Sequence, residues 1–339
     1  MFRWIIDDTR ALLRDVGRAF GNLTRRWRWF RIHSRQKLDR TAADLDNVRR
    51  SAAATTRMCR SCRALIALDA RVCPECGDVP GDRVSRGFTR VLENMVPGAM
   101  SVSAGLLTTT LIFYALSLLV WSRFQEDLPG GLRQGAWNVA LWGLGANVPG
   151  LVFNGEIWRL LTSVFLHGGI LHLLFNSWAL LTVGPLMEEI YGPRRLLMMY
   201  VSTGVAASLV SDLWRAGGNP WSTGIGASGA ICGLIGAAAA WGWRRGGSVG
   251  EGIKGQMVQW AIYVLVAGFL FRFDNAAHFG GLVSGGLLGL VLRDGQPRSA
   301  AARAAWEMIS WLCALAVVAS FVMVALHYER TIQFLLQHG

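Results

Sequence analysis

The sequence predicts an all-α polytopic membrane protein with seven spans, preceded by a small zinc ribbon. Three observations lead to this prediction. The 339 residues are 52% hydrophobic and only 17% charged, whereas a soluble globular domain carries about 25% charged residues. The net charge is nevertheless +12, and residues 1–100 hold +9 of it. Four cysteines form two Cys-x-x-Cys pairs within this basic part. The composition excludes a disordered chain, a secreted disulfide scaffold and a single soluble α/β enzyme.

Apolar segments after residue 100 are long enough to cross a bilayer, whose ~30 Å hydrocarbon core needs ~20 mostly apolar residues. We expect seven spans, of which the third and fifth have the least defined ends: Ser101–Trp121, Thr162–Met187, Leu196–Val210, Ile225–Trp243, Met257–Phe271, Ala276–Leu292 and Ala304–Leu326. Between the first two, residues 122–158 are rich in tryptophan and glycine, which predicts a long outer loop partly in the membrane interface.

The charge distribution predicts the orientation in the membrane. No signal peptide opens the chain, so the first span is expected to direct insertion. Lys and Arg favour the cytoplasmic side, and the basic first 100 residues therefore predict a cytoplasmic N-terminus. Seven spans then place the C-terminus outside, in a multi-pass protein of the plasma (inner) membrane. The expected parts are a basic, amphipathic segment 1–57, a zinc ribbon 58–80, a linker 81–100, a six-helix core 101–292, an inner loop 293–303, a seventh helix 304–326 and an outer tail 327–339.

A few polar side chains interrupt the spans, and such groups are costly in lipid and point to function. With the N-terminus inside, the second, fourth and sixth spans all start at the outer surface. His167, Ser228 and His278 each lie within about two turns of that end. His172 and Asn176 follow His167, and their spacing of four places both on one helix face. These side chains are therefore expected at one depth.

Glycines explain how the fourth and sixth spans could approach each other. Each carries a GxxxG pattern beside its polar residue, Gly229 with Gly233 and Gly281 with Gly285. Small residues at this spacing let helix backbones pack closely. Such packing would bring the serine and the histidine within hydrogen-bond reach.

The chemistry that such a set supports is acyl transfer. Serine becomes a strong nucleophile only when a base takes its proton, and neutral histidine suits that role. The Ser228 amide, Asn176 and His172 are available as oxyanion donors, and Gly226 with Gly229 leaves the backbone around the serine unhindered.

Each of these residues also has a simpler interpretation. Serine in a Gly/Ala-rich membrane helix commonly packs or bonds to a backbone carbonyl, and membrane histidines serve as proton relays or metal ligands. Asp274, four residues before His278, is interpreted mainly as a helix cap. Only the joint pattern favours a serine hydrolase over a transporter, which would show an inverted repeat.

These residues closely resemble the rhomboid family of intramembrane serine proteases, over about residues 145 to 290. The resemblance is carried by Gly145-Ala146-Asn147, Gly155-Glu156-Ile157-Trp158-Arg159-Leu160, Thr162 to His167, His172-Leu173-Leu174-Phe175-Asn176, Glu188-Glu189, Gly192, Gly226-Ala227-Ser228-Gly229 and Ala277-His278-Phe279-Gly280-Gly281. Their order, spacing and placement on the spans all agree with the family pattern.

The resemblance implies the roles of these residues. Ser228 matches the nucleophile and His278 the general base, while His172 and Asn176 match the oxyanion side. Trp158-Arg159 matches a structural motif of the outer loop, and His167 a position linked to structure and water organisation.

The resemblance also implies a six-plus-one helix arrangement, substrates that are single-span membrane proteins cut near the outer end of the span, and no cofactor for the protease chemistry. Four residues after the nucleophile, Cys232 stands where many members have Tyr or Phe against the histidine. A less firmly held His278 is the expected result. The alternative function is a non-catalytic relative that binds membrane helices.

The cysteines of the N-terminal part have the spacing of a structural zinc site. The set Cys59, Cys62, Cys73 and Cys76 forms two Cys-x-x-Cys pairs with ten residues between them. This pattern is typical of tetrahedral zinc, and a cytoplasmic location disfavours disulfides. A pair of redox dithiols is the alternative. We expect a structural zinc ribbon that regulates activity or docks a protein partner.

The segment 1–57 mixes arginine with tryptophan and leucine, as in Arg25 to Arg31. One interpretation is an amphipathic segment on anionic lipid. Binding to nucleic acid is less favoured. A basic tail that only enforces topology is the third alternative.

Overall fold

The computed structural model describes residues 56–58, 65–67, 70, 101–127, 135–295, 297 and 299–338. The chain divides into two compact units, Met1–Phe88 and Thr89–Gly339. In the first unit, strands β1 (Thr56–Met58) and β2 (Leu65–Ala67) pair antiparallel, with Thr56 opposite Ala67. The segment between these strands contains the first Cys-x-x-Cys pair. All four predicted zinc ligands lie outside the described residues.

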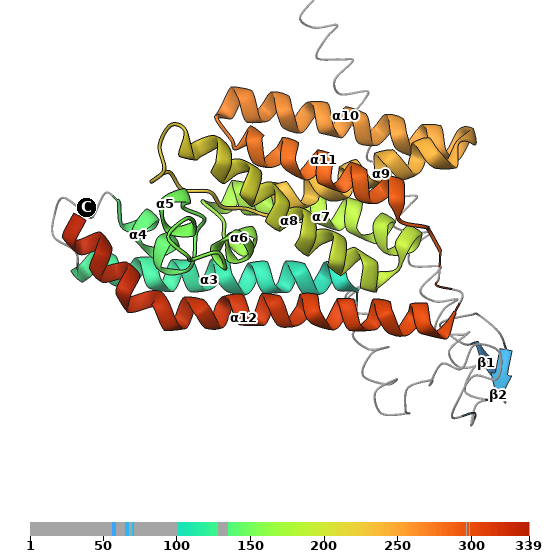
Figure 1. Ribbon diagram of the computed structural model, residues 1–339, viewed down its shortest axis with the longest axis horizontal. Helices are drawn as coiled ribbons and strands as arrows, with labels where there is room; N and C mark the ends of the chain where they lie inside the picture. Colours follow the sequence, from blue (N-terminus) through green and yellow to red (C-terminus); the bar gives the residue numbers. More distant parts are fainter. Residues whose placement is uncertain are drawn as a thin grey trace, which may run out of the picture. The chain divides into compact units, whose positions relative to one another are not determined.

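The second unit is a bundle of helices (Figure 1). In chain order these are α3 (Val102–Asp127), α4 (Ala136–Gly143), α5 (Pro149–Val152), α6 (Arg159–Thr162), a 3₁₀ turn (Ser163–Phe165), α7 (Ile170–Tyr191), α8 (Pro193–Ala216), α9 (Ser228–Arg245), α10 (Gly247–Phe271), α11 (Asn275–Val291) and α12 (Ala300–His338). The short helices α4, α5 and α6 gather at one end of the long ones (Figure 1). We call this the Ser228 end, because α9 starts there.

Five of the described helices, rather than the seven expected, are long and apolar enough to cross a membrane: α3, α7, α8, α10 and α12. The protein is therefore a multi-pass integral membrane protein. The two other expected spans correspond to α9 and α11. Helix α11 has only 17 residues, and the 18 residues of α9 include many glycines and end in two arginines. Most of α9 is buried inside the bundle, whereas α11 buries the face that carries His278 and its glycines. Other helices therefore shield much of α9 from lipid.

Helices α8, α9 and α11 pack against one another and form the centre of the unit. At Gly281 and Gly285 of α11, a Cβ atom would overlap the carbonyl oxygens of Gly229 and Gly233 on α9. At Gly236 of α9, a Cβ atom would likewise overlap the carbonyl oxygen of Leu282 on α11. The two backbones are thus in direct contact, as the paired GxxxG patterns predict.

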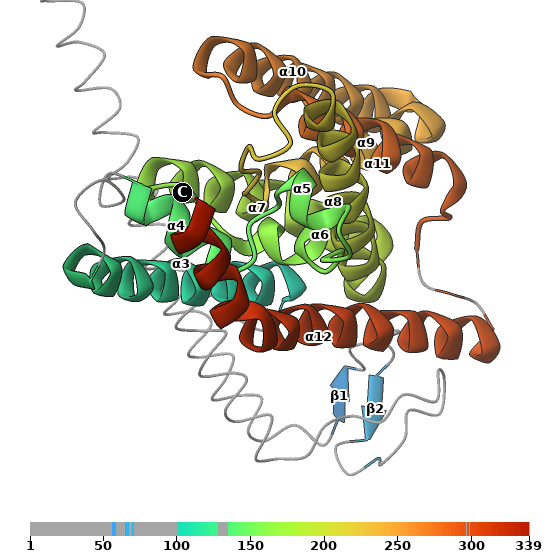
Figure 2. The ribbon, with the colours of Figure 1, turned by 60° about the vertical axis from the view of Figure 1, so that its left-hand side comes forward.

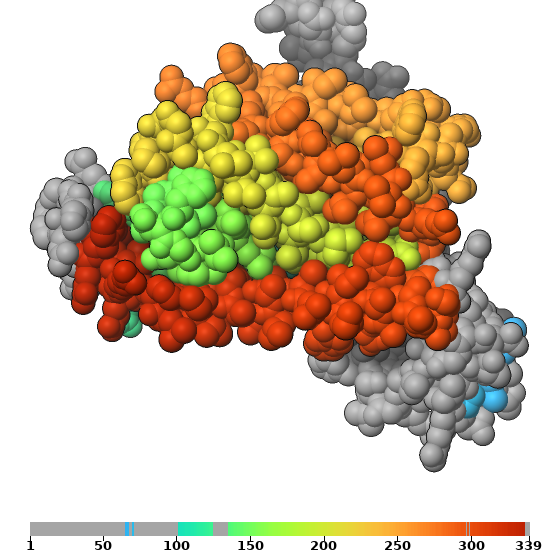
Figure 3. All heavy atoms as spheres, viewed as in Figure 1, coloured from blue at the N-terminus to red at the C-terminus, as the bar shows by residue number. Residues whose placement is uncertain are grey.

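The remaining long helices surround this centre. Helix α10 packs mainly on α9, and α3 lies beside α12 in both views (Figures 1 and 2). The rings of Phe113 and Phe321 stack between those two helices, with centroids 3.7 Å apart. Helix α12 runs along one whole edge of the helical unit (Figure 3).

Several element boundaries differ from the expected ones. The second long helix begins at Ile170 and not at Thr162, so His167 precedes it. Within the expected outer loop, α4 is a largely buried helix. The expected tail 327–339 is helical as far as His338, because Tyr328 and Ile332 pack against α4 at Gly143.

A buried arginine holds the short helices together. The Arg159 side chain is 0% exposed, and its Nε donates to Glu156 Oε2 at 2.6 Å. Its Nη1 donates to the carbonyl oxygens of Trp142 and Ala146, and its Nη2 donates to Thr331 Oγ1 at 3.1 Å. One guanidinium thus joins α4, α6 and the end of α12.

The glycine contact between α9 and α11 makes a stability prediction. Gly285→Ala places a methyl group against the Gly233 carbonyl and is expected to cost about 1–3 kcal/mol of unfolding free energy. Gly286→Ala is the matched control, because its methyl would lie 3.9 Å from the nearest atom, the Gly236 oxygen. Thermal unfolding in detergent micelles measures both variants. Equal stability of the two would contradict the contact.

Candidate active site

Ser228 is the first residue of α9 and follows a sharply turned loop. Gly226 has a backbone φ of +116°, which residues other than glycine rarely adopt. Its N–H donates to the Ser163 carbonyl at 2.9 Å, which ties the loop to the 3₁₀ turn. The serine thus sits in the first turn of a helix, where backbone N–H groups lack intrahelical acceptors and the helix dipole is positive.

His278 lies one turn into α11 and is almost fully buried. Its Nε2 is 2.9 Å from Ser228 Oγ. The short distance follows from the glycine contact between the two helices, since Gly281 is one turn beyond the histidine and Gly229 is next to the serine. The structure thus brings together the two residues that the sequence predicts as nucleophile and base.

Asn275, which sequence reasoning missed, orients the histidine. Its Oδ1 lies 3.2 Å from His278 Nδ1, and its Nδ2 donates to the Leu265 carbonyl at 3.1 Å. The second bond fixes the amide so that its oxygen faces the imidazole. Nδ1 is therefore the protonated ring nitrogen, and Nε2 is free to accept the serine proton. The spacing of three residues on one helix was the available signal.

Asp274 is the N-cap of α11, as expected, and accepts a hydrogen bond from the Ala277 N–H at 2.9 Å. Its carboxylate also accepts a hydrogen bond from Ser211. The histidine is thus oriented by the neutral amide of Asn275, and not by this carboxylate.

His172 and Asn176 of α7 border the loop before the nucleophile. Asn176 Nδ2 donates to the His172 carbonyl at 3.0 Å. His172 Nδ1 accepts from the Gly168 N–H at 3.4 Å, which leaves the ring proton on Nε2. A Cβ on Gly226 would lie 2.7 Å from this Nε2. Glycine at 226 thus lets two side-chain donors reach the backbone two residues before the serine.

His167 packs behind this group. It is fully buried just before α7, and its ring centroid lies 4.9 Å from that of His172. Neither of its ring nitrogens has a hydrogen-bond partner among the described residues. Its contact with His172 supports the ring that borders Gly226.

Cys232 is buried one turn along α9 from the serine. A Cβ on Gly281 would lie 3.2 Å from the Cys232 Cβ, so the thiol lies at the glycine contact between the helices. The imidazole therefore depends on Asn275 for its orientation, rather than on an aromatic ring at position 232. Within the part of the chain that the structure describes, no group of three or more His, Cys, Asp or Glu could hold a metal ion.

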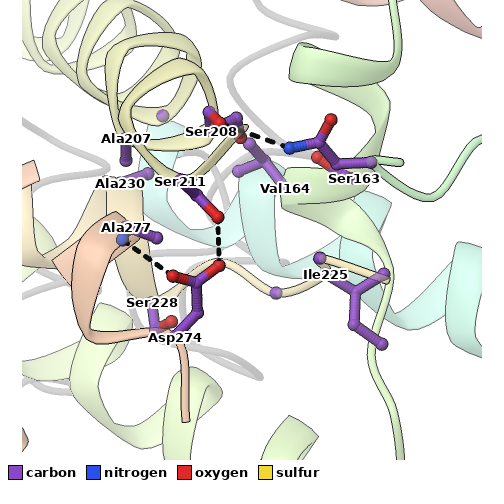
Figure 4. A pocket seen from close by; sticks show the side chains of 15 residues that line it. Ser163, Val164, Ala207, Ser208, Ser211, Ile225, Ser228, Ala230, Asp274 and Ala277 are labelled. Carbon is purple, nitrogen blue, oxygen red and sulfur yellow. Dashed lines mark hydrogen bonds between the residues drawn. The ribbon is translucent and has the colours of Figure 1, made fainter. Parts of the chain in front are cut away.

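A small polar cavity of about 30 Å³ adjoins Ser228 (Figure 4). Its lining includes Ser163, Ser208, Ser211 and Asn147. A water molecule needs about 10–15 Å³ of such space, so the cavity can hold one, and its lining offers several polar partners. The site thus combines a serine, an oriented neutral histidine, donors beside the serine and room for a water. This is the arrangement needed for acyl transfer to water.

Comparisons with known proteins identify relatives of the chain. The rhomboid domain matches residues 154–295. The chain is 40% identical over 165 residues to RHOMBOID-like protein 5 of Arabidopsis thaliana, covering 44% of this chain and 48% of that protein. It is 33% identical to rhomboid protease GluP of Bacillus subtilis, covering 65% of this chain and 41% of GluP. It is 30% identical to rhomboid protease AarA of Providencia stuartii, covering 56% of this chain and 73% of AarA. The chain thus spans less than half the length of the first two relatives.

The orientation of His278 by Asn275 makes a reactivity prediction. Asn275→Ala removes the amide and with it the hydrogen bond to His278, worth about 1 kcal/mol, and should slow labelling of Ser228 by a fluorophosphonate about fivefold. Asn154→Ala is the control, since Asn154 is exposed and bonds only to the Gly150 carbonyl. Unchanged labelling of Asn275→Ala in folded protein would contradict the assigned role.

Proposed function

The chain belongs to the rhomboid family, and we propose that it is an intramembrane serine protease. The observation that carries the proposal is the 2.9 Å approach of Ser228 Oγ to His278 Nε2, with Nδ1 held by Asn275. A hydroxyl paired with an oriented neutral imidazole is the arrangement that activates serine. The protease names of two relatives, GluP and AarA, support the same reading.

In the proposed mechanism, Ser228 attacks the carbonyl carbon of the scissile peptide bond while His278 takes the hydroxyl proton. The tetrahedral oxyanion is stabilised by the Ser228 N–H and by the side chains of His172 and Asn176. His278 then gives its proton to the leaving amine, which breaks the C–N bond and leaves an acyl enzyme. A water from the polar cavity hydrolyses this ester by the reverse proton transfers.

The proposed substrates are single-span membrane proteins, cut within or near the outer end of the spanning helix. The position of the dyad supports this choice. Ser228 begins α9, and His278 is one turn into α11, so both lie at one end of apolar helices and not at their midpoints. A substrate at this depth must present an unwound peptide bond, because a helical bond has its carbonyl engaged within the helix.

The proposed topology keeps the N-terminus cytoplasmic and the Ser228 end outside, in the plasma (inner) membrane. The Lys and Arg excess of the first 100 residues supports it. Counting α9 and α11 together with the five apolar helices gives seven crossings and an outer C-terminus.

The N-terminal unit is proposed to hold a structural zinc ion through Cys59, Cys62, Cys73 and Cys76, for regulation or for docking a protein partner. The pairing of β1 with β2 supports the proposal, because it brackets the first Cys-x-x-Cys pair with a two-stranded hairpin. Cys59 and Cys62, which lie between these strands in the sequence, would supply half of a tetrahedral set of thiolates.

Cleavage of a model single-span substrate in liposomes tests the protease proposal. Ser228→Ala and His278→Ala should abolish cleavage, and Asn176→Ala should lower kcat on the order of 10²-fold by removing an oxyanion donor. Ser177→Ala is the matched control on α7, because its hydroxyl bonds only to the Leu173 carbonyl.

Equal cleavage by the wild type and Ser228→Ala would refute the dyad. Binding of the substrate without cleavage, and without labelling of Ser228, would instead favour a non-catalytic helix-binding relative.

Metal analysis and reporter fusions test the N-terminal proposals. The full chain should contain about one zinc per molecule, and Cys59→Ser should lower this content while Cys313→Ser, a substitution in α12, should not. Reporters fused to the two termini should lie on opposite sides of the membrane. Metal-free protein, or termini on the same side, would overturn the corresponding proposal.

A further inference from the structure

Helix α8 supplies no reacting group, although it packs against both helices that do. Its last two turns nevertheless carry a cluster of polar side chains at the level of the dyad: Ser211, Asp212 and Arg215. Ser211 and Asp212 are buried, and the Arg215 side chain is only 13% exposed. Burying this many polar groups is costly unless they are paired, so their partners indicate their role.

One side of the Arg215 guanidinium holds the loop that leads to the nucleophile. Its Nη1 donates to the Ser222 carbonyl at 2.8 Å. The group also lies flat against Gly224, where a Cβ would come within 2.6 Å of Nη2. Gly224 is itself paired with Asn147 through two backbone hydrogen bonds of 3.0 and 2.7 Å. The guanidinium thus packs on the loop four residues before Ser228.

The other side of the guanidinium reaches the helix of the general base. Arg215 Nε donates to Ser211 Oγ at 2.9 Å, and the Ser211 hydroxyl in turn donates to Asp274. Asp274 caps α11, the helix that carries His278. Figure 4 shows the Ser211 and Asp274 side chains facing each other directly above Ser228. Arg215 Nε is also 3.9 Å from Asp274 Oδ2.

Two carboxylates share this one cation. Asp212 Oδ1 accepts from Arg215 Nη2 at 2.8 Å, and the Asp212 side chain is 0% exposed. Asp212 is three residues before Arg215 on the same helix and fixes the rotamer of the guanidinium. Only a planar group with several donors can serve the loop carbonyl, the Ser211 hydroxyl and the Asp212 carboxylate together, which an ammonium group cannot do.

We infer that Arg215 is a positioning residue that sets the distance between the nucleophile and the general base. It does so by joining the loop before Ser228 to the N-cap of the helix of His278. This inference rests on the proposed protease function. It adds that Arg215 holds Ser228 and His278 at the distance that proton transfer between them requires.

Substrate cleavage by Arg215→Lys in the full-length protein, reconstituted in liposomes, tests the inference. We expect kcat to fall about 10- to 100-fold, as for a displaced catalytic group, with KM unchanged because Arg215 does not line the oxyanion site. Labelling of Ser228 by a fluorophosphonate should slow in parallel.

Arg244→Lys is the matched control. Arg244 also links α9 to α11, through Nη1 and the carbonyl oxygens of Gly289, Leu290 and Leu292, but at the opposite end of the helices. It should lose thermal stability without a selective loss of kcat. Ser211→Ala serves as a second variant if Arg215→Lys does not fold, because it removes the hydrogen bonds of Ser211 to Arg215 Nε and Asp274 but leaves the bond of Arg215 to the loop.

The outcomes separate the two proposals. A wild type that neither cleaves nor takes the label refutes the protease function itself. If the wild type is active but kcat and labelling of Arg215→Lys or Ser211→Ala are no lower than those of Arg244→Lys, only the positioning role is overturned. A fall in kcat and labelling beyond the control supports it.

Discussion

The direct contact of α9 with α11 is the constraint on which the rest of the helical unit depends. Two glycines of α11 lie so close to α9 carbonyls that a methyl group would not fit. Contact of this kind fixes both the distance and the relative rotation of the helices, because side chains cannot adjust to a shift. The 2.9 Å approach of Ser228 to His278 is a result of that fixed geometry. The many glycines of α9 are tolerated because other helices pack around it.

Several arginines of the unit each donate to more than one nearby acceptor. Arg159 joins the short helices to α12 in this way, and Arg244 binds the carbonyls at the end of α11. Near the latter, the pKa of Asp294 is lowered chiefly by the hydrogen bond from the Trp241 indole. Arginine suits these places because its planar donors can serve carbonyls that a helix end leaves unpaired.

The reacting residues could be found from the sequence because lipid makes polar side chains informative. Ser228 and His278 stand out among apolar neighbours, and the glycines beside them indicate which helices approach. Asn275 and Arg215 could not be found in this way. Both lie near helix ends, where polar residues are common and do not stand out. Their roles depend on hydrogen bonds to the backbone carbonyls of Leu265 and Ser222, which lie in other elements of the fold. The start of α7 was missed because Val164, Phe165 and Leu166 continue the apolar pattern ahead of the helix, although residues 163–169 form a 3₁₀ turn and a loop.

The length of α12 has a consequence for how the protein fits its bilayer. Its 39 residues span about 58 Å at 1.5 Å per residue, nearly twice the ~30 Å thickness of the hydrocarbon core. Some turns of the helix therefore stand in the headgroup layer or beyond it, even when the helix is tilted. The last of these turns carry Thr331, the partner of the buried Arg159. We therefore expect thickening or thinning of the surrounding lipid to change the load on this hydrogen bond, which would transmit hydrophobic mismatch at α12 to the short helices at the Ser228 end.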